Sequence, residues 1–299
     1  MINTNAPDIL FPHLGIVIQT IKDHITVFNF DVMFYGIIIG LGVIAGMFIT
    51  VNDAKRRGQN QDDYWDCFSL MLILGVIGAR LYYVAFSWDY YSANLKEIIN
   101  LRGGGLAIYG GIIGGMLGIL ITALRKKRNF FEMMDSIMPS LMIGQAVGRW
   151  GNFFNCEAFG EYTDSLFAMR IKESLVSSSS VTELMKANRI IENGASYIQV
   201  HPTFLYESVW NLCSFVLVSI YARKFQKFKG EILCAYMVLY GTGRSIIEGL
   251  RTDSLYIGST GIRVSQALSV TIAVAGLAII IVNRLRIKKA GNNSAADIA

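Results

Sequence analysis

Charged residues and prolines are scarce in this chain, and their scarcity argues against a soluble protein. Of the 299 residues, 16% are charged and four are proline, whereas 53% are hydrophobic. The mean hydropathy is +0.43. Soluble domains carry about 25% charged residues. The composition therefore predicts a membrane protein, and it excludes a soluble nucleic-acid binder despite a formal net charge of +5.

Cysteine and histidine are too few to build a disulfide framework or a metal centre. The four cysteines, Cys67, Cys156, Cys213 and Cys234, form no CxxC pair, and three of them lie inside apolar segments. The sequence contains no HExxH, GxSxG or Walker pattern. We therefore expect no metal, no cofactor and no serine triad.

Apolar runs of about 20 residues, each long enough to cross ~30 Å of hydrocarbon, alternate with short polar stretches. They predict an all-α integral membrane protein with seven transmembrane helices. The expected spans are 28–50, 66–87, 105–124, 131–148, 203–222, 231–249 and 262–283. The expected parts are an extracytoplasmic N-terminal arm (1–27), helices one to four (28–148), a small extracytoplasmic head (149–202), helices five to seven (203–283) and a basic tail (284–299). The arm lacks the basic and apolar regions of a cleaved signal, so we expect it to be retained.

Basic residues predict the orientation, because they gather in alternate short loops. Fifteen of the 27 lie after spans one, three, five and seven: Lys55, Arg56, Arg57, Arg125, Lys126, Lys127, Arg128, Arg223, Lys224, Lys227, Lys229, Arg284, Arg286, Lys288 and Lys289. By the positive-inside rule these loops are cytoplasmic. The N-terminus and the head then lie outside, and the C-terminus lies inside.

Ionisable residues within the spans are costly to insert, which makes each a candidate for function. They fall at the outer ends of the expected helices: Arg80, Arg102, Arg149, Glu207, Arg244 and Glu248. Any single pair could be an ion pair that locks two helices together. Several arginines at one depth instead favour phosphate recognition, since a guanidinium binds phosphate bidentately. We expect a cavity that opens to the outer leaflet, in which Glu157, Glu207 and Glu248 hold the guanidiniums or one of them acts as a base.

Glycines spaced four apart within spans, such as Gly110, Gly114 and Gly118, indicate close helix packing. His201, at the junction of the head and span five, is expected to cap or orient its surroundings.

The segment from Gly148 to Gly160 closely resembles the signature of bacterial prolipoprotein diacylglyceryl transferases. Matching segments follow along most of the chain: Phe34-Tyr35-Gly36, Gly78-Ala79-Arg80 with Tyr83, the run from Gly104 to Gly114, His201-Pro202-Thr203, Tyr206-Glu207, and the run from Tyr240 to Arg244 with Glu248. The seven-span topology with an external N-terminus is also the family's topology.

The resemblance implies an enzyme of the bacterial cell (inner) membrane. It would transfer the diacylglyceryl group of phosphatidylglycerol to the lipobox cysteine thiol of a prolipoprotein signal peptide, and release glycerol 1-phosphate. The expected catalytic residues are Arg149, Arg244, Glu157, Glu248 and Tyr109. The expected substrate-binding residues are Tyr35, Arg80, Asn152, Asn155, Gly160, Glu207, Tyr240 and His201.

One position departs from the family. Its His-Gly-Gly stretch, whose histidine is a candidate for the catalytic base, is Tyr109-Gly110-Gly111 here. A phenol with a pKa of about 10 is a poor base at neutral pH. The base is therefore expected elsewhere, with Glu157, Glu248 and His201 as candidates. The alternatives are a non-catalytic member that binds phospholipid or signal peptide, and an unrelated transporter, which the absence of internal repeats disfavours.

Overall fold

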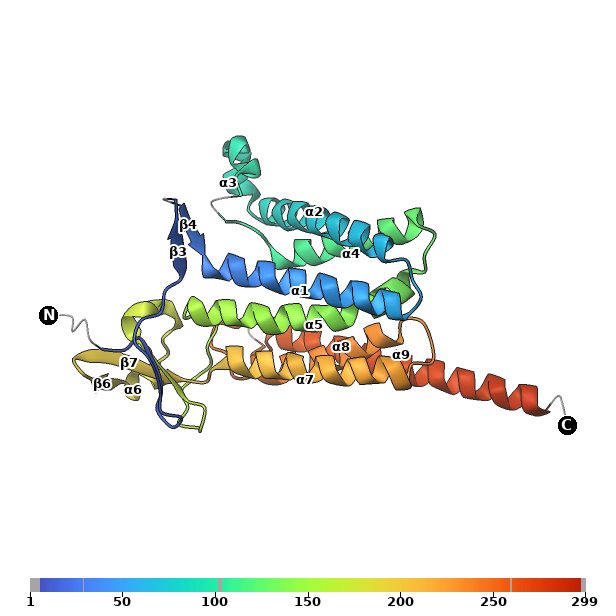
Figure 1. The fold of residues 1–299 in the computed structure, drawn as a ribbon. Coiled ribbons are helices and arrows are strands. Elements are labelled where there is room, and N and C mark those ends of the chain that lie inside the picture. The colour runs from blue at the N-terminus through green and yellow to red at the C-terminus, as the bar shows by residue number, and fades with distance from the viewer. Residues whose placement is uncertain (1–5, 29, 102–103, 259, 297–299) are drawn as a thin grey trace. The chain divides into compact units, whose positions relative to one another are not determined.

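A computed structural model describes residues 6–28, 30–101, 104–258 and 260–296, with side chains up to residue 290 (Figure 1). The chain divides into two compact units. Met1–Gly46 and Leu141–Ala299 form the first unit, and Met47–Ser140 form the second. Most of the described residues are helical.

A long helix overlaps each of the seven segments predicted to span the membrane. They are α1 (Phe34–Arg56), α2 (Gln61–Phe86), α4 (Ile108–Arg125), α5 (Phe130–Phe154), α7 (Thr203–Lys224), α8 (Glu231–Glu248) and α9 (Val264–Ala296). Five of them are long and apolar enough to cross a membrane, namely α1, α2, α4, α7 and the Val264–Ala290 part of α9. The helices α5 and α8 fall short of this measure and carry buried charges, among them Asp135 and Glu231. That α5 and α8 also span the membrane stays a prediction.

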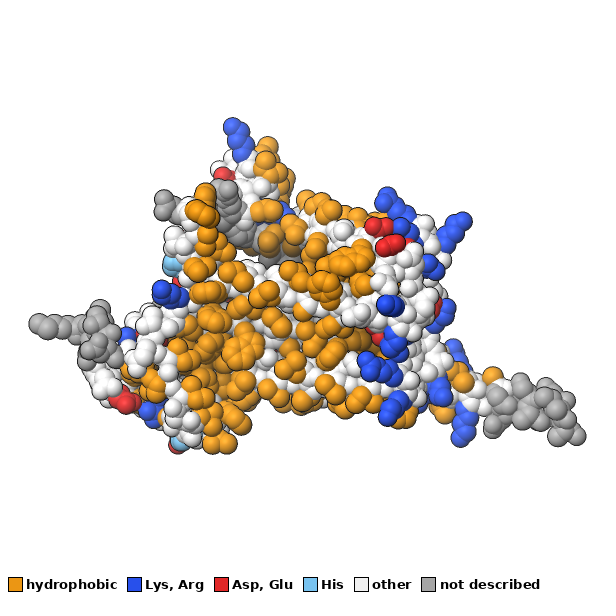
Figure 2. All heavy atoms as spheres, viewed as in Figure 1, with side chains coloured by type: hydrophobic (Ala, Val, Ile, Leu, Met, Phe, Trp, Pro, Cys, Tyr) orange, Lys and Arg blue, Asp and Glu red, His pale blue; other side chains and the backbone are white. Residues whose placement is uncertain are grey.

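The apolar helices present their hydrophobic side chains outward. On α1, Ile39, Leu41, Ile44 and Phe48 are all exposed, and Figure 2 shows hydrophobic side chains spread over the helical surface. Such a surface is stable only when lipid covers it, because apolar area in contact with water is unfavourable. The described chain is therefore an integral membrane protein of mostly helical structure.

The all-α expectation needs a correction outside the long helices, because the head is built on a β-sheet. Its antiparallel order is β2-β1-β5-β7-β6. The strands are β1 (Ile9–Phe11), β2 (Ile16–Ile18), β5 (Met169–Lys172), β6 (Ile190–Glu192) and β7 (Ala195–Val200). The N-terminal arm thus belongs to the head sheet, with Ile9 opposite Ile171. Strands of three to six residues are too short to give a periodic signal, which is why the sequence did not reveal them.

Shorter elements complete the chain. A separate hairpin, β3 (His24–Val27) and β4 (Phe30–Met33), precedes α1, so that helix begins later than predicted. The remaining elements are α3 (Trp88–Ala93), η1 (Leu95–Ile99), η2 (Glu173–Leu175), η3 (Ser178–Ser180) and α6 (Glu183–Ala187).

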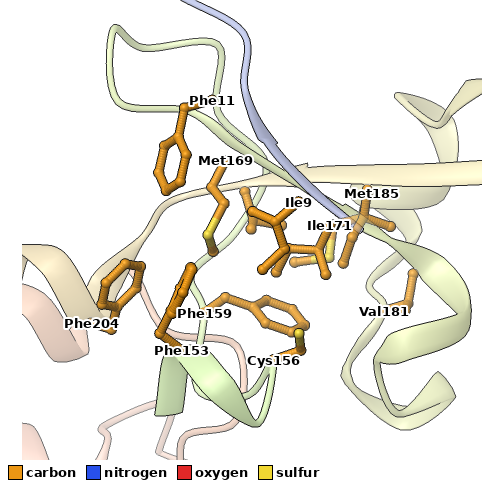
Figure 3. Close-up of a cluster of buried hydrophobic side chains, with 12 residues drawn as sticks. Ile9, Phe11, Phe153, Cys156, Phe159, Met169, Ile171, Val181, Met185 and Phe204 are labelled. Atoms are coloured by element: carbon orange, nitrogen blue, oxygen red, sulfur yellow. The ribbon is translucent and has the colours of Figure 1, made fainter. Parts of the chain in front are cut away.

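One hydrophobic core joins the head sheet to the ends of two long helices (Figure 3). Ile9 and Ile171 come from the sheet, Phe153 from the last turn of α5, and Phe204 from the first turn of α7. Phe153 and Phe204 also pack ring against ring, with centroids 4.7 Å apart. This core fixes residues 152–160, here called the signature loop, which begin in the last turn of α5, relative to the start of α7.

In the second unit, glycines bring α2 and α4 into close contact. A Cβ on Gly114 would collide with the carbonyl group of Leu74, and a Cβ on Gly118 would lie 2.9 Å from the backbone of Met71. The predicted packing role is therefore confirmed for these glycines. Gly115, directly after Gly114, faces open space.

We expect Gly114→Ala to destabilise the protein, by about 1–3 kcal/mol, because the methyl group has no room between two backbones. Gly115→Ala is the matched control, since it adds the same methyl group to the neighbouring turn position without a contact. The measurement is the thermal unfolding midpoint of each purified variant in detergent. Equal midpoints for the two variants would contradict the packing role of Gly114.

Candidate functional site

A cluster of arginines and carboxylates lies in the first unit where α5, α7 and α8 approach one another. Its centre is Glu207, in the second turn of α7, which is only 4% exposed. Arg149 of α5 places Nη2 2.7 Å from Glu207 Oε2, and Arg244 of α8 places Nη1 2.9 Å from Oε1. Arg251, from the loop after α8, lies 3.7 Å from the same Oε1. One buried carboxylate thus holds three guanidiniums.

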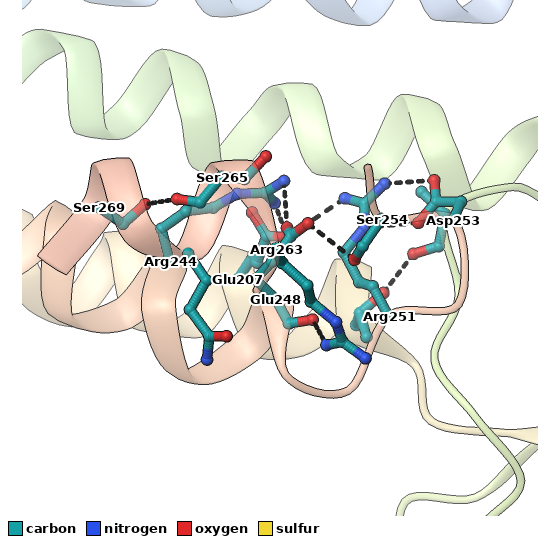
Figure 4. A network of polar contacts seen from close by, with 12 residues as sticks. Glu207, Arg244, Glu248, Arg251, Asp253, Ser254, Arg263, Ser265 and Ser269 are labelled. Atoms are coloured by element: carbon teal, nitrogen blue, oxygen red, sulfur yellow. Dashed lines mark hydrogen bonds and ion pairs between the residues drawn. The ribbon is translucent and has the colours of Figure 1, made fainter. Parts of the chain in front are cut away.

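A second buried carboxylate, Glu248, secures Arg244 from its own helix (Figure 4). Arg244 Nη2 lies 2.6 Å from Glu248 Oε2, one turn along α8. Ser254 donates its hydroxyl to Oε1 at 2.8 Å, and Arg263 donates to the main-chain carbonyl of Glu248. Glu248 thus contacts a guanidinium, which is one of the two roles expected for it. Arg244 is fixed between two carboxylates.

Arg251 is held in the same way by its neighbour Asp253. The guanidinium donates from Nε to Oδ1 at 2.9 Å and from Nη2 to Oδ2 at 2.6 Å, which is a bidentate pair. Burial alone would raise the pKa of Asp253, but the hydrogen bonds and charge of Arg251 outweigh it and lower that pKa. Asp253 is therefore ionised at neutral pH, and it balances the third arginine of the cluster.

The exposed fractions differ among the three arginines. The Arg149 side chain is 23% exposed, against 15% for Arg244 and 11% for Arg251. A guanidinium has five N–H donors on two edges, and pairing with a carboxylate uses one edge. Arg149 is thus the member of the cluster most accessible to another anion.

The signature loop is connected to Arg149 through side-chain amides. Arg149 Nη1 lies 3.5 Å from Asn152 Oδ1, and the Asn152 amide donates to Glu157 Oε1 at 3.0 Å. The Asn155 amide donates to the same oxygen at 3.2 Å. Glu157 therefore accepts from two asparagines, whereas the sequence analysis expected it to hold a guanidinium or to act as a base. It is exposed, unlike Glu207 and Glu248.

Gly160 ends this loop in a position that admits only glycine. A Cβ there would lie 2.8 Å from both His201 Cβ and the carbonyl oxygen of Leu250. The Gly160 amide donates to the His201 carbonyl at 2.9 Å, and Glu161 donates to Leu250 at 2.9 Å. The backbone of the loop is thus hydrogen-bonded to the residues just before α7 and just after α8. The role of Gly160 that these contacts support is to permit this close approach of the backbone.

His201 stands at this junction, as predicted, and its ring lies beside α7. Its Nδ1 is 3.2 Å from the Tyr206 hydroxyl. Burial lowers the pKa of His201 below its ordinary value, so the imidazole is neutral at pH 7.

Two tyrosines expected to bind substrate pack beside the cluster. Tyr240 lies one turn before Arg244 on α8 and stacks on Tyr236 with ring centroids 5.4 Å apart. Tyr35, in the first turn of α1, packs so closely on Gly151 that a Cβ there would lie 2.6 Å from its ring.

Arg80 and Tyr109 belong to the second unit, where Arg80 has an unexpected set of partners. All its donors face main-chain carbonyls. Nε donates to Ile98, Nη1 to Gly104 and Gly105, and Nη2 to Glu97 and Asn100, at 2.5–2.9 Å. The guanidinium thus organises the loop before α4 instead of presenting an open edge to phosphate. Tyr109, in the first turn of α4, is 44% exposed.

Sequence reasoning missed Arg251, Asp253, Ser254 and Arg263. The sequence did offer one signal for the two arginines. Arg251 and Arg263 lie in or beside a loop assigned to the outer side, whereas most other basic loop residues were assigned to the cytoplasmic side. The predicted Arg102 lies outside the described residues. Among the residues described, no group of three or more His, Cys, Asp or Glu side chains could hold a metal ion.

Comparison with known proteins gives a single family. The family model for prolipoprotein diacylglyceryl transferase matches residues 23–282. The phosphatidylglycerol–prolipoprotein diacylglyceryl transferase of Finegoldia magna is 43% identical over 252 residues, which cover 84% of this chain and 91% of that protein. The enzyme of the same name from Clostridioides difficile is 38% identical, over 84% of this chain and 91% of its own length. The one from Bacillus mycoides is 37% identical, over 91% of this chain and 95% of its own length.

The matched segment contains every member of the arginine–carboxylate cluster and of the signature loop. The identities hold over nearly the whole length of each relative, so they cover the spans and the head together. The chain therefore belongs to the prolipoprotein diacylglyceryl transferase family.

Proposed function

We propose that this protein transfers the diacylglyceryl group of phosphatidylglycerol to the lipobox cysteine of a prolipoprotein. The cysteine sulfur forms a thioether bond to the glyceryl carbon, the carbon–oxygen bond to phosphate breaks, and glycerol 1-phosphate leaves with the bonding electrons. The thiol proton passes to a base. The names of the relatives support both substrates. The observation that carries the proposal is the set of three arginines held by Glu207.

The leaving group is a phosphate ester whose negative charge grows as the bond breaks. Guanidiniums already fixed by carboxylates need little reorganisation to stabilise that charge, and such electrostatic stabilisation is commonly the largest catalytic effect. We assign this role to Arg149 and Arg244. Arg251 positions the cluster through Glu207, and Tyr35, Tyr240 and Asn152 line the neighbourhood of the two arginines.

Tyr109 is not proposed as the proton acceptor, because a neutral phenol is a poor base at neutral pH. Of the two carboxylate candidates, Glu248 is buried, pairs with Arg244 and accepts the Ser254 hydroxyl, so an incoming thiol would have less access to it than to the exposed Glu157. Glu157 contacts only amide donors among the described side chains. We propose Glu157 as the acceptor, with the neutral His201 imidazole as the other candidate.

The function is tested with purified protein in vesicles that contain phosphatidylglycerol. Adding a lipobox peptide should release glycerol phosphate, and the same peptide with its cysteine replaced by serine should release none. Phosphate release that does not depend on the cysteine would contradict the proposed transfer.

Arg149→Lys and Arg244→Lys keep the positive charge but lose the bidentate geometry, so each should lower turnover by about a hundredfold or more. Arg170→Lys is the matched control, because Arg170 pairs with Gln199 and Glu192 in the head sheet. The readout is glycerol phosphate release at saturating peptide. Near-normal turnover in both Arg149→Lys and Arg244→Lys would remove the arginines from the mechanism.

Tyr109→Phe should lower activity about tenfold, or ~1.4 kcal/mol, the scale of one lost hydrogen bond. Loss of Glu157 or Glu248 should have a larger effect. An inactive Tyr109→Phe beside fully active carboxylate variants would reverse this order and make Tyr109 the proton-transfer group. Tyr109→His restores the residue typical of the family, and a large gain in rate would show that the native chain works without its best base.

We propose further that all seven long helices span the cell membrane, with the N-terminus and the head outside and the C-terminus in the cytoplasm. The support is the position of the basic residues in alternate loops. Cysteines introduced at Gly58 and Lys227 should then escape an impermeant thiol reagent added to intact cells, and should react after the membrane is opened. Labelling of either position in intact cells would contradict the orientation.

A further inference from the structure

The hairpin formed by β3 and β4 has two faces of opposite character. In its antiparallel register Ile25 lies opposite Val32, and Val27 lies opposite Phe30. Because side chains alternate along a strand, these four apolar residues share one face. The pairs Thr26–Asp31 and His24–Met33 occupy the other face, which is polar apart from Met33 at the end of β4. The hairpin is therefore a two-stranded amphipathic ribbon.

The polar face satisfies its own hydrogen bonds. Thr26 donates its hydroxyl to Asp31 Oδ1 at 2.7 Å, and His24 Nδ1 lies 2.6 Å from Asp23 Oδ1. His24 Nε2 also lies 3.8 Å from Asp31 Oδ1. The side chains of Asp23, His24 and Asp31 are 43–62% exposed. This face is built for contact with water.

The apolar face, in contrast, is left uncovered. Ile25 is 47% exposed, Val27 43%, Phe30 69% and Val32 39%, and Phe28 beyond the end of β3 is 93% exposed. Within the described residues, β3 and β4 pair only with each other. A lone two-stranded hairpin is marginally stable in water at best, so another surface must cover its apolar face.

The hairpin is joined directly to a helix whose exposed side chains are largely apolar. Met33 ends β4 and Phe34 begins α1, with no linker between them. The Phe34 amide also donates to the Asp23 carbonyl at 2.7 Å, which fixes the base of the hairpin on the first turn of α1. That helix is one of the five apolar enough to cross the membrane. Its first turn therefore lies where hydrocarbon meets lipid headgroups, the region in which aromatic side chains gather.

We propose that the β3–β4 hairpin lies in the headgroup region of the leaflet at the N-terminal end of α1. Its face of Ile25, Val27, Phe30 and Val32 rests on the acyl chains, Phe28 enters the same layer, and the face with Thr26 and Asp31 remains in water. The partner is the lipid surface itself. Amphipathic segments bind bilayers in this way, by burying one apolar face at the interface. The proposal does not depend on the transferase reaction.

Fluorescent probes attached to single cysteines test the proposal in the full chain. Cys213, the one exposed cysteine among the four, is replaced by serine, and the three buried ones remain. An environment-sensitive probe is then attached to Val27→Cys or Phe30→Cys on the apolar face. Thr26→Cys, on the opposite face of the same strand, is the matched control.

The labelled proteins are placed in vesicles of phosphatidylcholine and phosphatidylglycerol. A nitroxide-bearing phosphatidylcholine should quench positions 27 and 30 severalfold more strongly than position 26, and aqueous iodide should show the reverse order. Strong iodide quenching at all three positions would place the hairpin in water and overturn the proposal. Weak quenching of positions 27 and 30 by both reagents would overturn it as well, because protein would then cover the apolar face. Circular dichroism of each labelled protein checks that it is folded.

Discussion

The carboxylate of Glu207 is the point on which the arrangement of the first unit depends. It is nearly inaccessible to solvent, and it contacts arginines from α5, from α8 and from the loop that follows α8. Buried guanidiniums without a partner are strongly unfavourable, and Glu207 is the one carboxylate that contacts all three arginines, while Glu248 also pairs with Arg244 and Asp253 with Arg251. Glu207 therefore both orients the arginines and links α5, α7 and α8.

The signature loop is connected to the same cluster by hydrogen bonds of its asparagines instead of by ion pairs. Its asparagines are linked to Arg149 and Glu157 by hydrogen bonds, whereas its ends are fixed by the hydrophobic core of the head and by the tight contact at Gly160. Cys156 and Ala158 adopt the left-handed backbone conformation, with φ of 49° and 56°. Such conformations are unfavourable for residues with side chains and persist where the surrounding structure enforces them. The head therefore imposes the shape of the loop.

The sequence alone was enough to predict charged site residues, because they are conspicuous within or beside long apolar runs. Charged residues at the ends of hydrophobic runs identified Arg149, Glu207, Arg244 and Glu248, and the structure brings all four together. The role of Arg80 could not be predicted, because its partners are main-chain carbonyls, which any sequence provides. The head sheet was missed for a related reason. Its strands are short, and the pairing of Ile9 with Ile171 joins segments about 160 residues apart.

That pairing has a consequence for the order in which the protein assembles. The strand β1 can form its hairpin with β2 as soon as both are synthesised, but its other edge needs β5. At a synthesis rate of about 5–20 residues per second, β5 follows β1 by roughly 8–30 s. During that time α1, α2, α4 and α5 are made. The first strand of the chain therefore waits with an unpaired edge while four long helices are produced, and the head can close only after α5 is complete.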